Sequence, residues 1–147
     1  MKKLILSIGL FLTVFSLSAF ATDEKNINPQ VLSAFNVEFS GAQNVKWTKV
    51  EGVYAVNFTQ NNFRIEAFFD EDGELLGTVR NILFNELPLS VTNAINKKYK
   101  NAPAYDIYEY TVGNETFYRM RVDLPGKTLQ VRCGMSGWVA TEKRIKQ

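Results

Sequence analysis

The chain has 147 residues, 46% of them hydrophobic, and it carries 17 basic against 15 acidic side chains. It has no histidine and one cysteine, Cys133, which excludes Ser-His-Asp and Cys-His catalysis, the usual zinc sites and an intramolecular disulfide. We expect Cys133 to be a small buried apolar residue. Chemistry based on lysine, tyrosine or carboxylates stays open, but no pattern indicates it, and we expect no enzyme, no cofactor and no metal.

The N-terminal residues have the pattern of an export signal. Lys2 and Lys3 precede an almost wholly apolar run over residues 4–17, and Ala19-Phe20-Ala21 is a small-x-small cleavage site. We therefore expect a signal peptide over residues 1–21, cleavage after Ala21, and a periplasmic or extracellular mature protein. The apolar run is shorter than the roughly 20 residues of a membrane span, so we expect no stable membrane anchor. An uncleaved signal anchor is the alternative.

Cleavage would also change the charge of the protein. Because Lys2 and Lys3 leave with the signal, residues 22–147 carry equal numbers of basic and acidic side chains. Proteins that bind nucleic acid need a basic excess to neutralise phosphates. We therefore expect no nucleic-acid partner.

A helix is expected to begin at Pro29. Asn28 is a good capping side chain, and proline suits the first helical position. An apolar stripe with four-residue spacing follows and ends before Gly41, and it consists of Val31, Phe35 and Phe39.

Short runs of alternating polar and apolar residues follow this helix and predict strands. They cover residues 45–48, 54–58, 64–69 and 75–82, and the dipeptides Glu51-Gly52 and Asn61-Asn62 are suitable hairpin turns. In this pattern Trp47 points to the same side as the helix, so we expect its side chain to be buried.

The same order of elements then begins again. Pro88 opens a second stripe with four-residue spacing, Pro103 follows it, and alternating runs occupy residues 105–107, 118–122 and 129–133. We therefore predict an α+β fold with two tandem copies, residues 22–84 and 85–147. Each copy has a helix on one face of its own four-stranded antiparallel sheet, and the two form one compact unit. Two unrelated meanders would give a similar pattern, and that alternative stays open.

The acidic stretch Asp70-Glu71-Asp72 before Gly73 has two interpretations. In the second copy the corresponding residues are Gly134-Met135-Ser136-Gly137, so the acids are absent and the last glycine remains. A hairpin loop that needs a positive φ explains the glycine. The stretch also lacks the full ligand set of an EF-hand loop. We interpret it as a solvated turn, with a weak cation site in the first copy as the alternative.

Three stretches together resemble a known family: "FSGAQNVKWTKVEGVYAVNF", "IEAFFDEDGELLGT" and "LPLSVTNAINKKY". They are similar to the PepSY-like, β-lactamase-inhibitor-protein-like (BLIP-like) domains exported by Bacteroidetes. The resemblance implies tandem units of a helix followed by four strands, and it implies no catalytic residue. The second copy departs from the pattern, because Ile107 replaces the tryptophan and the turn lacks its aspartate. Any ligand shared by both copies is therefore in doubt.

The faces of the sheets away from the helices are the candidate binding surfaces. Turns at Gly113-Asn114 and Pro125-Gly126 would place Tyr108, Arg119 and Arg132 in one row, and Asp106, Arg121 and Gln130 in the next. Arginine and tyrosine are enriched at binding hot spots. In the first copy, Phe68 is expected on the open face. The predicted binding residues are Arg119, Arg121, Arg132, Tyr108 and Phe68, and a solvated face without function is the alternative.

Two functions follow from this pattern. The first is an exported, non-catalytic binding or inhibitory module for another exported protein. The second is a carrier for a small acidic or amphipathic ligand on the open sheet face. A broad shallow face would favour the module, and a deep apolar pocket would favour the carrier.

Overall fold

The computed structural model describes residues 26–145. The predicted signal peptide over residues 1–21 and its cleavage site lie outside this range. Among the residues that the structure describes, no helix is both long enough and apolar enough to cross a membrane. The chain forms two compact units that divide within one strand, between Thr78 and Val79.

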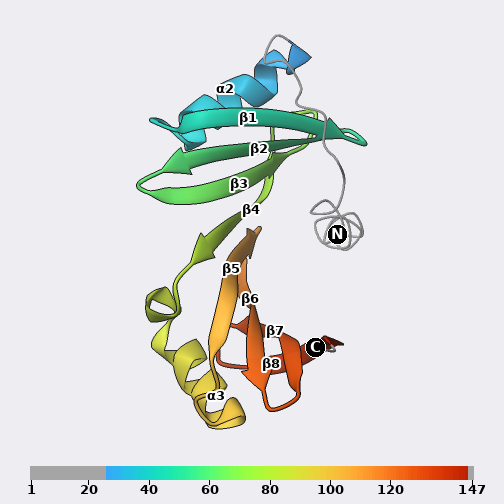
Figure 1. Cartoon of the computed structure of the whole chain (residues 1–147). Helices are drawn as coiled ribbons and strands as arrows, with labels where there is room; N and C mark the ends of the chain where they lie inside the picture. The colour runs from blue at the N-terminus through green and yellow to red at the C-terminus, as the bar shows by residue number, and fades with distance from the viewer. Residues whose placement is uncertain (1–25, 146–147) are drawn as a thin grey trace. The chain divides into compact units, whose positions relative to one another are not determined.

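The first unit begins with a helix that packs on a meander of strands (Figure 1). Its elements are α2 (Pro29–Glu38), β1 (Gln43–Val50), β2 (Val53–Gln60), β3 (Phe63–Phe69) and the first half of β4 (Leu75–Ile82). The predicted cap is confirmed, because the backbone N–H of Gln30 donates to the Asn28 side chain at 2.9 Å. The predicted turns are also present, since Glu51, Gly52, Asn61 and Asn62 all have positive φ.

Aromatic rings form the core between α2 and the strands of the first unit. Phe35 is 4% exposed, and its ring centroid lies 5.2 Å from those of both Trp47 and Phe58 in edge-to-face geometry. Edge-to-face pairs contribute energy beyond the area that they bury. Trp47 is itself 4% exposed, as the alternating pattern predicts.

The second unit contains the other half of β4 and the remaining elements. They are the short 3-10 helix η3 (Phe84–Glu86), α3 (Leu89–Tyr99), β5 (Ala104–Val112), β6 (Glu115–Leu124), β7 (Lys127–Gly134) and β8 (Val139–Ile145). Val91, Ile95 and Tyr99 are the buried residues of α3, and they are the predicted stripe. Ile107 is 3% exposed.

The prediction of two separate four-stranded sheets is wrong. The strands form a single eight-stranded antiparallel sheet in the order β1 to β8, and the described part of the fold is mostly β with two short α-helices. The reason is the length of β4, whose second half lies beside β5. There the Asn81 side chain donates to the Ile107 carbonyl at 2.9 Å, and Arg80 Nε donates to Glu109 at 2.6 Å. The boundary at residues 84 and 85 and the tandem repeat itself stay predictions.

The acidic loop after β3 is a tight turn that uses its own first acid. Asp70 Oδ1 accepts the backbone N–H groups of Asp72 and Glu74 at 3.0 and 2.8 Å. Gly73 has a φ of +81°, a conformation that glycine adopts without strain. Asp70 therefore orders the loop backbone, which supports the interpretation as a turn.

Candidate binding surface

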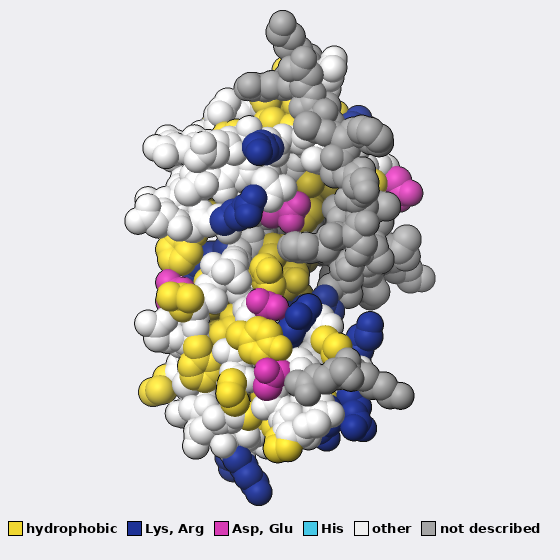
Figure 2. All heavy atoms as spheres, viewed as in Figure 1, with side chains coloured by type: hydrophobic (Ala, Val, Ile, Leu, Met, Phe, Trp, Pro, Cys, Tyr) yellow, Lys and Arg dark blue, Asp and Glu magenta, His cyan; other side chains and the backbone are white. Residues whose placement is uncertain are grey.

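The candidate surface lies on the face of β5–β8 that points away from α3. On β6, Tyr118, Met120 and Val122 are 2%, 1% and 0% exposed and form the core under the helix. Because successive side chains of a strand point to opposite faces, Phe117, Arg119 and Arg121 lie on the other face. Figure 2 shows hydrophobic, acidic and basic side chains side by side over this unit, in the lower half of the view.

The predicted register of the two arginines is confirmed. Tyr108 pairs with Arg119, Arg119 pairs with Arg132, and Arg121 pairs with Gln130. The prediction that Asp106 pairs with Arg121 is wrong, because Tyr105 takes that position. A bulge between Tyr105 and Tyr108, where Asp106 has a φ of +49°, shifts the pairing. Asp106 still reaches Arg121, with 3.4 Å between Oδ2 and Nη1.

Aromatic rings lie next to both arginines on the same face of the sheet. The rings of Tyr110 and Phe117 are stacked at 4.9 Å with an interplanar angle of 1°. The guanidinium carbon of Arg132 lies 3.8 Å from the centroid of Phe117, and that of Arg119 lies 5.7 Å from Tyr110. Each such cation–π contact contributes about 0.5–1 kcal/mol at an exposed site and more when water is excluded. The rings therefore offset part of the repulsion between the two arginines.

Trp138 is the functional candidate that the sequence analysis missed. Its indole lies over Gly134, at a distance that a Cβ on residue 134 would not permit. The indole is 46% exposed, and its centroid lies 5.7 Å from the guanidinium carbon of Arg132. Arg132 therefore lies near two aromatic rings, those of Phe117 and Trp138. The signal in the sequence is the glycine four residues before the tryptophan, at the start of the β7–β8 loop.

The charges on this surface are unequally compensated. Arg119 Nη2 donates to Glu142 Oε1 at 2.7 Å, and these side chains are 15% and 23% exposed. Arg121 and Asp106 form a looser pair and are each about half exposed. No ion pair among residues 26–145 includes Arg132. The Nε atoms of Arg119 and Arg132 are buried without a hydrogen-bond partner in the described part of the chain. Since Arg119 already donates to Glu142, the outer Nη groups of Arg132 are the donors that a partner could use.

Phe68 lies on the face of β3 opposite Ala67 and Phe69, the predicted face, but the prediction that its side chain is exposed there is wrong. Its side chain is 1% exposed, and its register partner Ala55 is 4% exposed. Burial of a phenylalanine ring is favourable by about 1.5–3 kcal/mol. A side chain buried to this degree offers no contact area, so we build the candidate surface without it.

Glu66 lies two residues before Phe68 on β3. Its side chain points to the same face as those of Phe68 and of its register partner Asn57. Burial raises the pKa of the Glu66 carboxyl above its ordinary value of 4.5, and the hydrogen bond from Asn57 at 3.1 Å opposes the shift only in part. A raised folded-state pKa means that the folded protein keeps a proton that the unfolded chain has lost. The stability due to this group is therefore present below about pH 4.5 and is lost as the pH rises through the folded pKa.

Replacing Glu66 by glutamine should stabilise the protein at neutral pH. Glutamine keeps an oxygen that can accept from Asn57 but cannot ionise, so we expect a melting temperature higher by roughly 1–4 °C at pH 7. At pH 3.5 the variant and the parent should melt together. Thermal melts followed by circular dichroism at both pH values test this, with the exposed turn variant Glu51→Gln as control. A lower melting temperature for Glu66→Gln at pH 7 would contradict the argument.

The nucleophile and base candidates of this unit are held in their neutral forms. Burial raises the pKa of the Cys133 thiol to about 12. Burial, together with the nearby Glu109, raises the pKa of Tyr118 to about 12 as well. A neutral thiol is a poor nucleophile and a neutral phenol a poor base, so these two side chains are not in their reactive forms.

Comparison with solved structures identifies the fold of the chain. No family model matches the sequence, and no curated protein matches it. Among solved structures, a BLIP-like protein from Bacteroides fragilis has a TM-score of 0.70 at 22% identity, over 86% of this chain and 94% of that one. The chain has the BLIP-like fold. A DUF2874 family protein from Bacteroides ovatus has a TM-score of 0.69 at 20% identity, over 82% and 88% of the two chains.

A third similar structure comes from Bacteroides eggerthii and is provisionally described as periplasmic. Its TM-score is 0.69 at 17% identity, over 82% of this chain and 88% of that one. None of these three proteins is described as PepSY-like, so that part of the resemblance stays a prediction. At these identities the likeness concerns the fold alone.

Proposed function

We propose that this protein is an exported, non-catalytic module that binds another exported protein through one face of β5–β8. This surface, the arginine face, consists of Arg119, Arg121, Arg132, Tyr110, Phe117 and Trp138. The single observation that carries the proposal is the state of Arg132. Its guanidinium carbon lies 3.8 Å from the ring centroid of Phe117 and 5.7 Å from that of the exposed Trp138, and it has no ion-pair carboxylate among the described residues. An oriented guanidinium beside an exposed tryptophan is the composition of a protein-binding hot spot.

The chemistry of the face indicates the kind of group that it binds. A guanidinium presents its N–H groups as a planar fork that matches a carboxylate. Arg119 already donates to Glu142, so Arg132 is the better candidate for a carboxylate of a partner. An exposed indole next to it adds apolar contact area. The expected partner segment therefore has an aspartate or glutamate that lies beside an apolar side chain.

Export is the second component of the proposal. The basic start, apolar run and Ala-x-Ala site of residues 1–21 support a cleaved signal. The provisional periplasmic description of the Bacteroides eggerthii protein with the same fold supports it too. We place the mature protein in the periplasm or outside the cell.

A small-ligand carrier is the alternative, and the burial of the rings argues against it. Tyr110 and Phe117, the rings that stack beneath the arginines, are only 7% and 6% exposed. A carrier would need these rings to line an accessible apolar cavity. Their contact area is instead used within the sheet, which leaves Trp138 and Arg132 as a shallow surface.

Affinity capture tests the module against the carrier. The tagged mature protein should retain a protein from a periplasmic extract of the producing cell, and Arg119→Ala/Arg132→Ala should retain none of it. A melting temperature within a few degrees of the parent would show that the variant is folded. Equal capture by both proteins would contradict a role for this face, and capture of a small molecule without a protein would favour the carrier.

A further inference from the structure

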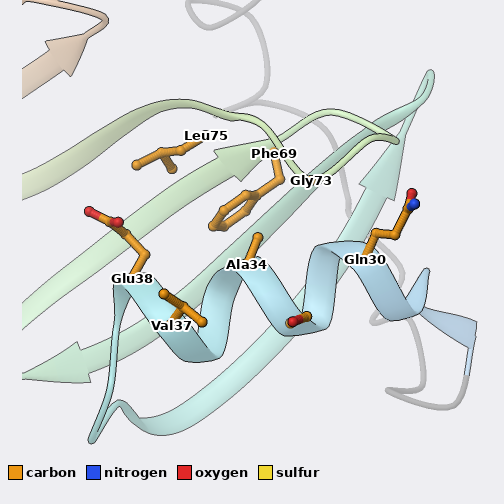
Figure 3. A pocket seen from close by; sticks show the side chains of 8 residues that line it. Gln30, Ala34, Val37, Glu38, Phe69, Gly73 and Leu75 are labelled. Carbon is orange, nitrogen blue, oxygen red and sulfur yellow. The ribbon is translucent and has the colours of Figure 1, made fainter.

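The first unit has a groove between the last turns of α2 and the start of β4, with a volume of about 520 Å³. Figure 3 shows Ala34, Val37 and Glu38 on the helix side, opposite Phe69, Gly73 and Leu75. Val37 is 80% exposed, although Val31 and Phe35 of the same helix are 0% and 4% exposed. The groove therefore has apolar walls that solvent reaches.

The second unit has the same helix-to-loop contact, which shows what lies in the corresponding place. A Cβ built on Gly73 would lie 3.0 Å from the backbone oxygen of Gln30. A Cβ built on Gly137 would lie 3.1 Å from the backbone oxygen of Ser90. The loop after the third strand that follows each helix, β3 or β7, thus contacts the first turn of that helix at the same point.

From this shared point, the corresponding residues at the other end of each helix can be identified. The residue that follows Ser90 by eight positions is Lys98, and the residue that follows Gln30 by eight is Glu38. Lys98 Nζ donates to the carbonyl of Val139 on β8 at 2.8 Å, so its side chain spans the space between α3 and the strand. A glutamate carboxylate has no N–H to donate, so Glu38 cannot form the same bridge. The groove in the first unit is the place where this lysine is missing.

The electrostatics at the end of α2 favour a cation. Glu38 is the last residue of the helix, and the last turn of α2 contains no basic residue, whereas that of α3 contains Lys97 and Lys98. A helix C-terminus carries a partial negative charge that basic residues stabilise and acidic residues do not. No ion pair within residues 26–145 includes Glu38. This end of the groove is therefore negative, and no cation of the described residues forms an ion pair there.

We propose that the groove binds a lysine side chain next to an aliphatic residue, presented by an extended segment of a partner protein. The ammonium lies beside the Glu38 carboxylate at the C-terminal end of α2, in the space that corresponds to the one that the Lys98 side chain spans between α3 and β8. The aliphatic neighbour packs on Val37 and Leu75. This site is in the first unit and does not depend on the arginine face of the second, so either proposal can fail without the other.

The probe for this site is the blocked dipeptide acetyl-Leu-Lys-amide, titrated into the ¹⁵N-labelled mature protein. Saturable shifts are expected at the amides of Ala34, Val37, Glu38, Gly73 and Leu75, with a dissociation constant in the millimolar range, as suits so small a ligand. Acetyl-Leu-Glu-amide is the matched control and should give none. The absence of saturable shifts up to roughly 20 mM acetyl-Leu-Lys-amide, well above the expected constant, overturns the proposal.

Two substitutions of one residue make the test sharper. Glu38→Gln keeps the size of the side chain and removes its charge, so binding should weaken about two- to fivefold, the range of one exposed ion pair. Glu38→Lys supplies the missing lysine from within the chain, so it should abolish the shifts and raise the melting temperature. Undiminished binding by Glu38→Gln overturns the proposed role of the carboxylate.

A second copy of this chain is the other occupant to be distinguished. Sedimentation velocity of the mature protein should show a monomer whose behaviour Glu38→Lys leaves unchanged. If the parent instead dimerises, Glu38→Lys is monomeric and the dipeptide does not bind, then the groove is a self-association surface and the proposal of a partner segment is wrong.

Discussion

Replacing Trp47 by alanine is expected to lower the free energy of unfolding by about 3–5 kcal/mol, the usual range for emptying a large buried aromatic site. The indole is 4% exposed and lies edge-on against Phe35 with 5.2 Å between the ring centroids. Its loss would remove the contact between β1 and the centre of α2. Since small domains have only about 5–15 kcal/mol of stability, urea titration should show a large fall in the unfolding midpoint.

Trp138 is a control for this experiment within the same chain. It is the other tryptophan of the sequence, and it is 46% exposed. Trp138→Ala should cost less than about 1 kcal/mol, because the indole is nearly half exposed and lies at the surface of the sheet, where substitutions have small effects. If Trp47→Ala unfolds at the same urea concentration as the parent, Trp47 is not part of the core. The proposed register of β1 against β2 would then be wrong.

Local features of the fold could be predicted from the sequence because short-range chemistry decides them. Asn28 caps α2 since its side-chain oxygen reaches the N–H of a residue two positions later. The hairpin turns follow from residues that tolerate positive φ, such as Asn61 and Asn62. Turn positions then set the register, and this is why the pairing of Arg119 with Arg132 was correct.

The failures concern features that depend on distant parts of the chain. The partner of the second half of β4 is set by β5, through Asn81 and Ile107, and neither residue carries a local signal for that pairing. Bulges are also not predicted by the pattern, because one extra residue shifts the alternation of a strand and a short strand offers too few residues beyond the bulge to reveal the shift. The bulge that holds Asp106 moved one predicted pair, and an irregularity between Gln130 and Val131 in the β7–β8 pairing lies next to Glu142, the unpredicted partner of Arg119.

The arginine face illustrates how one small residue can define a site. Gly134 has no Cβ, so Trp138 can fold back across the sheet and lie next to Arg132. An alanine at residue 134 would displace the indole, because it would occupy the same space. The sequence shows both residues, but only the hairpin geometry brings the indole to the arginine.

Once a partner is captured, Arg132→Ala should weaken its binding by about 30-fold or more, the effect of losing a hot-spot residue worth at least 2 kcal/mol. The reason is that Arg132 lies against the Phe117 ring, has a buried Nε and has no ion-pair carboxylate within residues 26–145, so a partner carboxylate meets an oriented donor. Arg132→Lys keeps the charge but lacks the planar fork that stacks on Phe117. We expect it to recover only part of the affinity. Isothermal titration calorimetry with the purified partner gives these constants.

The matched control for this series is Arg64→Ala, which makes the same change of charge at an exposed residue of β3 in the first unit. It should change the affinity less than about twofold, as expected for an exposed charge outside a contact.

Trp138→Ala should weaken binding at least about tenfold, since an exposed indole beside an arginine is a typical hot-spot pair. Arg132→Ala should still melt close to the parent, because Arg119 keeps Glu142 as its partner. If Arg64→Ala and Arg132→Ala weaken binding equally, the partner responds to overall charge, and the specific role of the Phe117–Arg132–Trp138 stack is refuted.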